Sequence, residues 1–156
     1  MPEQEPRDYV EMINAVAPDG WVAATGLKLL RATPDEVVAE LEIRPAHLQA
    51  YGIVHGGIHA GIVETLASIG AAITAMAKGK SVVGLENHTS FLRAVRSGVL
   101  RASAKPLSRG RRTHVWEGMI HDGEGRLVAT GRVRLLVLDP EAEVAGERVG
   151  IKAQGD

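Results

Sequence analysis

The chain of 156 residues has the length of one domain and can bury a single hydrophobic core. Its 45% hydrophobic and 24% charged residues exclude collagen, coiled coil and extended disorder. Its net charge of -1, its 3% aromatic residues and its lack of cysteine argue against a bulk nucleic-acid binder, disulfides and thiolate metal sites.

The N-terminal segment, residues 1–25, is predicted to hold one short helix over 9–17, which Pro18-Asp19-Gly20 ends. Its polar, acidic start lacks the features of a secretory signal, so together with the absence of cysteine we expect a cytoplasmic protein. Two strands, around 27–30 and 37–43, follow with a turn at 33–35 between them and predict a hairpin. Residues 44–54 are expected to be irregular.

Residues 57–78 predict a long helix, because large apolar residues recur at a spacing of 3.6. These residues are Ile58, Ile62, Leu66, Ile69, Ile73 and Met76, and the opposite side carries Ala60, Ala67, Ala71 and Ala75. The length would suffice to cross a membrane, but the glycines, the alanines and the central Glu64 weaken the hydrophobicity. We therefore expect a helix buried by protein and no membrane association.

Four strands are predicted over 81–91, 99–107, 113–121 and 126–138, with short turns between them. Short connections favour antiparallel neighbours, so the fold class is α+β: an antiparallel sheet of five or six strands wrapped around one long central helix. The domain is expected to span 26–138. The charged, aperiodic tail 139–156 is expected to be mobile.

Glu64 is the first candidate for chemistry, because it lies among apolar residues with no lysine or arginine within ten positions. A buried carboxylate without a partner costs several kcal/mol, which favours a functional role. The alternative is a structural carboxylate that Ser68, one turn later, or an arginine from elsewhere in the fold satisfies.

The start of the long helix offers a second group. His55-Gly56-Gly57 leaves backbone N–H groups free at the positive end of the helix dipole, where the Gly56 N–H could hold an oxygen with developing negative charge. The amide of Gln49 could hold a carbonyl or a water. Eight residues separate Gly56 from Glu64, roughly 12 Å along the axis, so one helix cannot bring both groups to one carbonyl.

Two antiparallel copies of the helix could do so, which predicts a homodimer with shared sites. We expect the close approach to be made by the small face of the helix, which comprises Ala60, Glu64, Ala67, Ser68 and Ala71.

Residues 87–116 contain no acidic residue and seven basic ones: Arg93, Arg96, Arg101, Lys105, Arg109, Arg111 and Arg112. This asymmetry indicates a local anion site, whereas a solvated surface or a nucleic-acid patch is the alternative. His55, His59 and Glu64 do not form a metal site at this spacing, because His55 precedes the helix. Ser68 and Thr65 lack the partners of a serine hydrolase.

GIVHGG at 52–57, Glu64 eight residues after Gly56, and ENHTSFLR at 86–93 closely resemble hotdog-fold acyl-CoA thioesterases over 26–138. The 4-hydroxybenzoyl-CoA thioesterases with a catalytic glutamate are the most similar subgroup, followed by the 1,4-dihydroxy-2-naphthoyl-CoA thioesterases. The resemblance implies hydrolysis of an aromatic or bulky acyl-CoA by a dimer of dimers, without metal or organic cofactor. A hotdog dehydratase or hydratase and a non-catalytic acyl-CoA-binding module remain the alternatives.

The resemblance also implies roles for individual residues. Glu64 would be the nucleophile or the general base, and the Gly56 N–H would polarise the thioester carbonyl. Gln49 would orient the thioester or the water, Ser68 would assist the hydrolytic step, and His55 would brace the loop. The residues implied in binding the CoA phosphates are Arg93, Arg109, Arg111 and Arg112, although the family has small hydroxylic residues at the last two positions.

Overall fold

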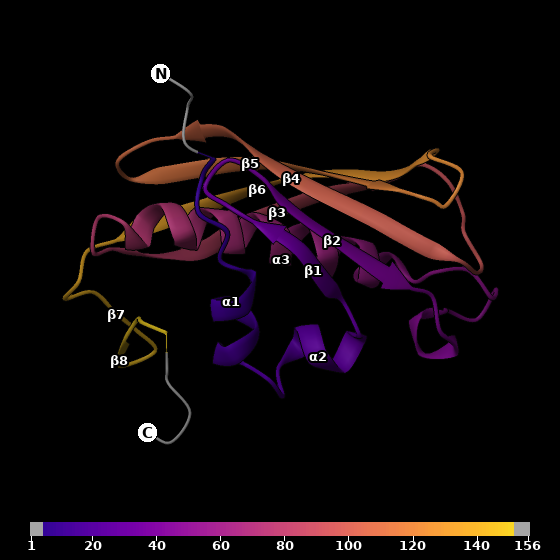
Figure 1. Ribbon diagram of the computed structural model, residues 1–156, viewed down its shortest axis with the longest axis horizontal. Coiled ribbons are helices and arrows are strands. Elements are labelled where there is room, and N and C mark those ends of the chain that lie inside the picture. The colour runs from indigo at the N-terminus through magenta and orange to yellow at the C-terminus, as the bar shows by residue number, and fades with distance from the viewer. Residues whose placement is uncertain (1–4, 152–156) are drawn as a thin grey trace.

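A six-stranded antiparallel sheet covers one side of the long helix α3 (Gly56–Met76) in the computed structural model, which describes residues 5–151 (Figure 1). The sheet order is β1-β2-β4-β5-β6-β3. The strands are β1 (Lys28–Ala32), β2 (Val37–Glu42), β3 (Ser81–Phe91), β4 (Val99–Arg109), β5 (Thr113–His121) and β6 (Leu127–Leu138). The predicted α+β class, the long helix and all six strands are confirmed.

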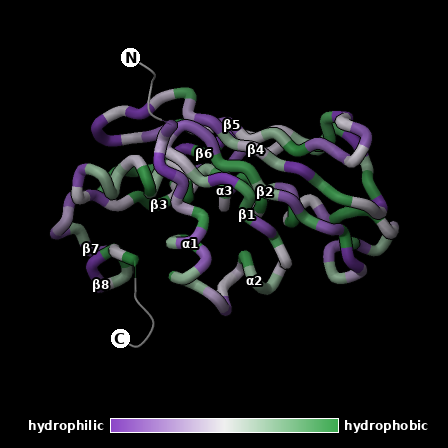
Figure 2. Tube along the Cα trace, viewed as in Figure 1, coloured by the Kyte–Doolittle hydropathy of each residue, from purple (hydrophilic) through white to green (hydrophobic). Residues whose placement is uncertain are grey.

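The first two strands form the predicted hairpin. Thr33 closes its turn, because its hydroxyl donates to the Glu36 carbonyl at 3.0 Å and accepts the Glu36 N–H at 3.0 Å. Along β2 buried and half-buried residues alternate, as expected for a strand with one face on the core, and Figure 2 shows hydrophobic and hydrophilic stretches alternating in the sheet.

The order of the strands differs from the prediction that strands consecutive in sequence are neighbours. β3 pairs with β6, and residues 92–98 then cross to β4 on the other side of β5. The Val128 carbonyl accepts the N–H groups of Leu92 and Arg93, and the Val95 carbonyl accepts the Val54 N–H, which together hold this crossing in place. β3 is therefore an edge strand.

Four short elements of the described chain were not predicted. After α1 (Val10–Val16), which confirms the predicted first helix, a second helix α2 (Trp21–Thr25) forms, and a 3-10 turn η1 (Pro45–His47) lies in the segment predicted to be irregular. Strands β7 (Glu143–Val144) and β8 (Glu147–Arg148) form a hairpin in the tail that we expected to be mobile. Elements of two to five residues are too short to show a periodicity.

The end of α2 is tied to the segment before α3. The Arg44 guanidinium donates to the Thr25 carbonyl at 2.7 Å, and His47 Nε2 donates to the same oxygen at 2.8 Å. His47 Nδ1 accepts the Arg44 N–H at 2.9 Å, so both ring nitrogens of this buried histidine are used. These bonds satisfy a carbonyl that the short helix leaves unpaired.

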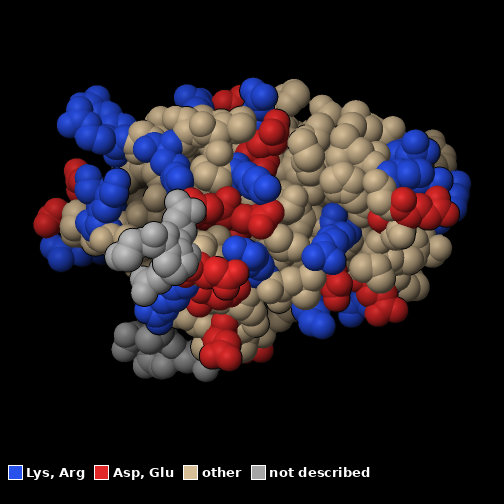
Figure 3. Space-filling model, turned by 45° about the horizontal axis from the view of Figure 1, so that its top comes forward, with Lys and Arg blue, Asp and Glu red and all other residues tan. Residues whose placement is uncertain are grey.

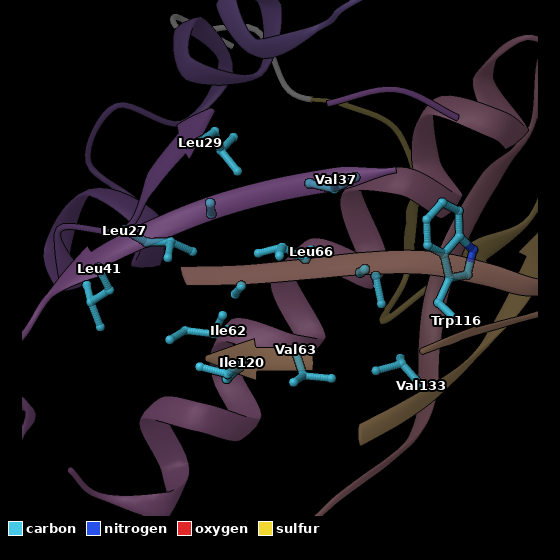
Figure 4. Close-up of a cluster of buried hydrophobic side chains, with 14 of the residues drawn as sticks. Leu27, Leu29, Val37, Leu41, Ile62, Val63, Leu66, Trp116, Ile120 and Val133 are labelled. Carbon is cyan, nitrogen blue, oxygen red and sulfur yellow. The ribbon is translucent and has the colours of Figure 1, made fainter. Parts of the chain in front are cut away.

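The core lies between α3 and the sheet, and Figure 4 shows side chains from both meeting there. Ile62, Val63 and Leu66 are each only 1% exposed. Ala67 and Ala71 are 0% exposed within one chain, so the prediction that they face a second copy of the helix is wrong. Their small side chains instead allow α3 to approach its own sheet closely.

By length and composition α3 could span a membrane, since its mean hydropathy reaches 1.4 over an 18-residue window. Its buried side chains pack against the sheet, which makes it the core helix of the fold, as predicted. The structure therefore gives no indication of a membrane protein.

The contact between Gly70 and Trp116 yields a prediction about stability. A methyl group at Gly70 would lie 2.2 Å from the ring of Trp116, which is fully buried. We expect Gly70→Ala to lower the free energy of unfolding by about 1–3 kcal/mol, measured by urea unfolding, because the ring has no room to move. Gly61→Ala is the matched control, since the clashing Trp21 is 43% exposed. An equal loss in both variants would contradict this account.

Candidate active site

The Glu64 carboxylate lies half-buried on α3 beneath the edge strand β3. The Asn87 side-chain amide donates to its Oε2 at 2.9 Å and also to the Ala60 carbonyl at 3.1 Å, and the Ser68 hydroxyl donates to its Oε1 at 3.4 Å. A methyl group at Gly84 of β3 would lie 2.5 Å from Oε1, so only glycine leaves room for the carboxylate.

Neutral groups alone therefore hold the acid. The ion pairs of the described chain, residues 5–151, include none to Glu64. The alternative of an arginine cap is wrong, while the predicted contact with Ser68 is present. A carboxylate held only by an amide and a hydroxyl keeps its negative charge available to a ligand.

His55 ends the loop and caps α3. Its Nδ1 accepts the Gly57 N–H at 2.8 Å, and its carbonyl accepts the Ile58 N–H at 2.9 Å. The Gly56 N–H, at the first position of the helix, has no acceptor within the described chain. The ring of Phe91 lies against Gly56, where an added methyl group would come within 2.8 Å of it. The helix start thus offers one free N–H beside an aromatic ring.

Gln49 lies half-buried in the loop before α3. Its N–H donates to the Ile53 carbonyl at 2.9 Å, and its side-chain oxygen accepts the Tyr51 N–H. The side-chain amide nitrogen remains to donate, and the predicted role of Gln49 in holding a carbonyl or water oxygen stays a prediction.

Two separate cavities divide these groups. Glu64 and Ser68 line a cavity of about 590 Å³ beneath α1 and α2, together with Ile13, Trp21 and Ile69. Gln49, Gly56 and Arg93 line another of about 350 Å³, together with His59 and Phe91. One chain therefore does not bring the carboxylate and the free N–H to the same cavity, in agreement with the separation of roughly 12 Å along α3.

His59 is a buried residue of the second cavity that the sequence suggested only as a metal ligand. It is 3% exposed, and burial lowers its pKa because the charged ring would lose its hydration. Asn87 was also missed. The only sequence signal for it is its place in ENHTSFLR, because its contact with Glu64 joins residues 23 positions apart.

A metal site finds no support in the histidines. His55 caps the helix through Nδ1, whereas His59 is buried against the sheet side of α3. Residues 5–151 contain no group of three or more histidines and acids that could hold an ion.

The arginines lie in two places. Arg93 is exposed at the second cavity, whereas Arg109 pairs with Asp35 at 2.9 Å beside the β1–β2 turn, with Arg111 and Arg112 in the adjacent turn. β4 separates the two places by roughly 33 Å. Basic and acidic side chains are interspersed on the face shown in Figure 3. One chain therefore does not gather the four arginines that the sequence grouped; their role in nucleotide binding stays a prediction.

Comparisons with known proteins agree with this architecture. A sequence profile of the thioesterase superfamily matches residues 51–129. A protein of Mycobacterium tuberculosis described as an esterase is 41% identical over 116 residues, 73% of this chain and 83% of that protein. Its structure gives a TM-score of 0.76 at 39% identity, covering 78% of this chain and 98% of that one.

Two relatives carry more specific descriptions. The proofreading thioesterase EntH of Cronobacter turicensis is 33% identical over 129 residues, which cover 83% of this chain and 93% of that protein. The crystal structure of a thioesterase from Haemophilus influenzae gives a TM-score of 0.80 at 29% identity, covering 86% of this chain and 93% of that one.

The lowered pKa of His59 predicts acid lability. At a pH below 6.5, the ordinary pKa of histidine, the ring of His59 takes up a proton more readily in the unfolded chain than in the folded one. The free energy of unfolding therefore falls as the pH falls. We expect the free energy of unfolding to decline between about pH 7 and pH 5, by at most about 1.4 kcal/mol per pH unit from this group. Urea unfolding of His59→Leu should show a shallower decline; parallel curves for the two proteins would contradict the assignment.

Proposed function

Because the chain belongs to the thioesterase superfamily and has the hotdog fold, we propose that this thioester hydrolase cleaves acyl-CoA to a free acid and coenzyme A. The observation that carries the proposal is the Glu64 carboxylate, which only neutral donors hold beside a cavity. A thioester carbonyl has little resonance with sulfur and a good thiolate leaving group, so it suits attack by a carboxylate or by a water that a carboxylate activates.

Two routes use the same residues. In one, a Glu64 oxygen attacks the carbonyl carbon, the C–S bond breaks, CoA leaves as thiolate, and water hydrolyses the resulting anhydride. In the other, Glu64 takes a proton from a water that attacks the carbonyl carbon directly, the C–S bond then breaks, and CoA leaves as thiolate. In both, the Gly56 N–H stabilises the negative charge that develops on the carbonyl oxygen, and Gln49 and Ser68 orient the thioester and the water. Neither route needs a metal or an organic cofactor.

A homodimer would complete the site. The free edge of β3 leaves backbone groups available for pairing, and its exposed Leu85 and Phe91 favour burial by a second copy. Antiparallel pairing about a two-fold axis near Thr89 would place Asn87 opposite the second copy's Phe91. Since Asn87 holds Glu64 and Phe91 covers Gly56, this register would carry the carboxylate of one protomer toward the free N–H of the other. A dimer of dimers is the assembly that the family resemblance implies.

The cavities support an aromatic or similarly bulky acyl group. The cavity beside Glu64 adjoins an apolar one of about 280 Å³ between α1 and α3, and the two share Ile13, Ala17, Ser68 and Ile69. Apart from Ser68, the side chains that line the smaller cavity are apolar. Within this class, the family resemblance favours a 4-hydroxybenzoyl or a dihydroxynaphthoyl group.

The nucleotide of the substrate would lie outside these cavities. Arg93 is exposed beside Gln49 and Gly56, where its guanidinium could bind a phosphate of CoA. We further propose a cytoplasmic enzyme that acts on a small-molecule substrate, without nucleic-acid or membrane partners.

Replacing Glu64 tests the proposed function. We expect Glu64→Ala to lower kcat roughly 10²- to 10⁴-fold, measured as thiol release from benzoyl-, phenylacetyl-, naphthoyl- and straight-chain CoA esters. Binding of free CoA, measured by calorimetry, should be retained. Glu40→Gln, on the outer face of the sheet, is the control.

Unchanged turnover in Glu64→Ala would contradict the assigned role. If the wild-type protein bound acyl-CoA without releasing thiol, it would be a binding module, and formation of an enoyl thioester instead of free thiol would identify a dehydratase.

Mixing two inactive variants tests the shared site. Gly56→Pro should be inactive, because proline lacks the required N–H and is tolerated at the first position of a helix. Co-refolding Glu64→Ala with Gly56→Pro should restore about a quarter of wild-type activity, since half of the dimers would be mixed and each would hold one intact site. Absence of recovery, with mixed dimers verified by native mass spectrometry, would contradict a site built from two protomers.

A further inference from the structure

His59 is a buried polar side chain without a partner beside the free N–H of Gly56. It is 3% exposed, and its Nδ1 is enclosed by protein atoms without any hydrogen bond. It also lines the cavity of about 350 Å³ that contains Gly56, Gln49 and Arg93. An apolar residue would fill this position without leaving a polar atom unpaired.

The surroundings determine which ring nitrogen carries the proton. Burial lowers the pKa of His59, so the ring is neutral at neutral pH and has one N–H. With the proton on Nε2, only a lone pair remains unpaired at the enclosed Nδ1, whereas the other tautomer would bury an N–H without an acceptor. We assign the proton to Nε2, which makes that nitrogen a hydrogen-bond donor.

His59 and Gly56 are three residues apart and therefore lie on the same face of α3, one turn from each other. Phe91 spans the two: its ring atoms would lie 2.8 Å from a methyl group at Gly56, and its centroid lies 6.0 Å from that of His59. The backbone N–H and the imidazole thus border one cavity beneath one aromatic ring.

We propose that His59 donates a hydrogen bond to the carbonyl oxygen of the bound thioester, as a second donor beside the Gly56 N–H. The inference rests on the proposed thioesterase function and deepens it. A neutral imidazole is suited to this task, because it donates without the hydration that a charged ring would have to lose on burial. This role gives a reason for a polar side chain in a position that costs stability.

Replacement of His59 should move activity and stability in opposite directions. We expect His59→Leu to lower kcat/KM roughly 10- to 100-fold while its Tm stays equal or rises, because the unpaired polar atom is gone. His59→Asn keeps an N–H donor and should recover part of the activity. The matched control is His114→Leu, since His114 is also buried with Nδ1 unpaired but lies near the far end of α3.

A binding measurement separates this inference from the proposed function. A ketone analogue of acyl-CoA, with a methylene between sulfur and carbonyl, keeps the carbonyl oxygen and cannot be hydrolysed. Calorimetry should show weaker binding of this analogue to His59→Leu than to wild type, with equal binding of CoA itself. Equal affinity of both proteins for the ketone, or an unchanged kcat/KM in a His59→Leu enzyme, would overturn the role of His59. Wild-type protein that binds the ketone but releases no thiol from the acyl-CoA esters would overturn only the proposed hydrolysis.

Discussion

The fixed rise of α3 is the constraint on which the candidate site depends. A helix advances about 1.5 Å per residue, so the free N–H at Gly56 and the carboxylate at Glu64 cannot approach each other within one chain. The two cavities agree with this separation, since Gly56 lines one of them and Glu64 lines the other. A reaction that needs both groups at one carbonyl therefore requires a second protomer. The unpaired edge of β3, which carries Asn87 and Phe91, is suited to bind one.

The position of Glu64 depends in turn on how α3 sits against its sheet. Small residues at the contact, including Ala67, Ala71 and Gly70, let the helix lie close to the strands. Gly84 then leaves space for the carboxylate. Asn87, which also donates to the Ala60 carbonyl, fixes the direction of the carboxylate through one hydrogen bond. The orientation of the acid is thus a property of the whole helix–sheet contact.

Much of this fold could be predicted from sequence because its signals are local and periodic. α3 and the six strands follow from hydrophobic spacing, and Glu64 stands out as an acid in an apolar helix. The strand order could not be predicted in the same way, because the pairing of β3 with β6 joins distant residues and the short loop 92–98 resembles a hairpin connection. The prediction that Ala67 and Ala71 contact a second copy of the helix was wrong. Small side chains indicate that another element packs closely against the helix, but they do not indicate whether that element is a second helix or the chain's own sheet.

The sequence predicted only some residues of the candidate site, because the others are defined by contacts between distant parts of the chain. Gln49, Gly56 and Ser68 belong to a recognisable spacing, whereas Asn87 and His59 gain their meaning from contacts across the fold. Arg109 shows a related limit: its charge suggested an anion site, and the structure adds an acidic partner, Asp35, that the sequence did not indicate. Composition indicates that charges are present, and only the folded chain determines which of them are already neutralised.

The shared acceptor at Thr25 links parts of the molecule that serve different cavities. Arg44 and His47 both donate to its carbonyl, which joins the end of α2, near the Glu64 cavity, to the segment that leads to Gln49. A displacement of α2 would strain or break these bonds, so the lining of the Glu64 cavity and the segment that leads to Gln49 are mechanically coupled. A change near α2 would for this reason affect the surroundings of both cavities.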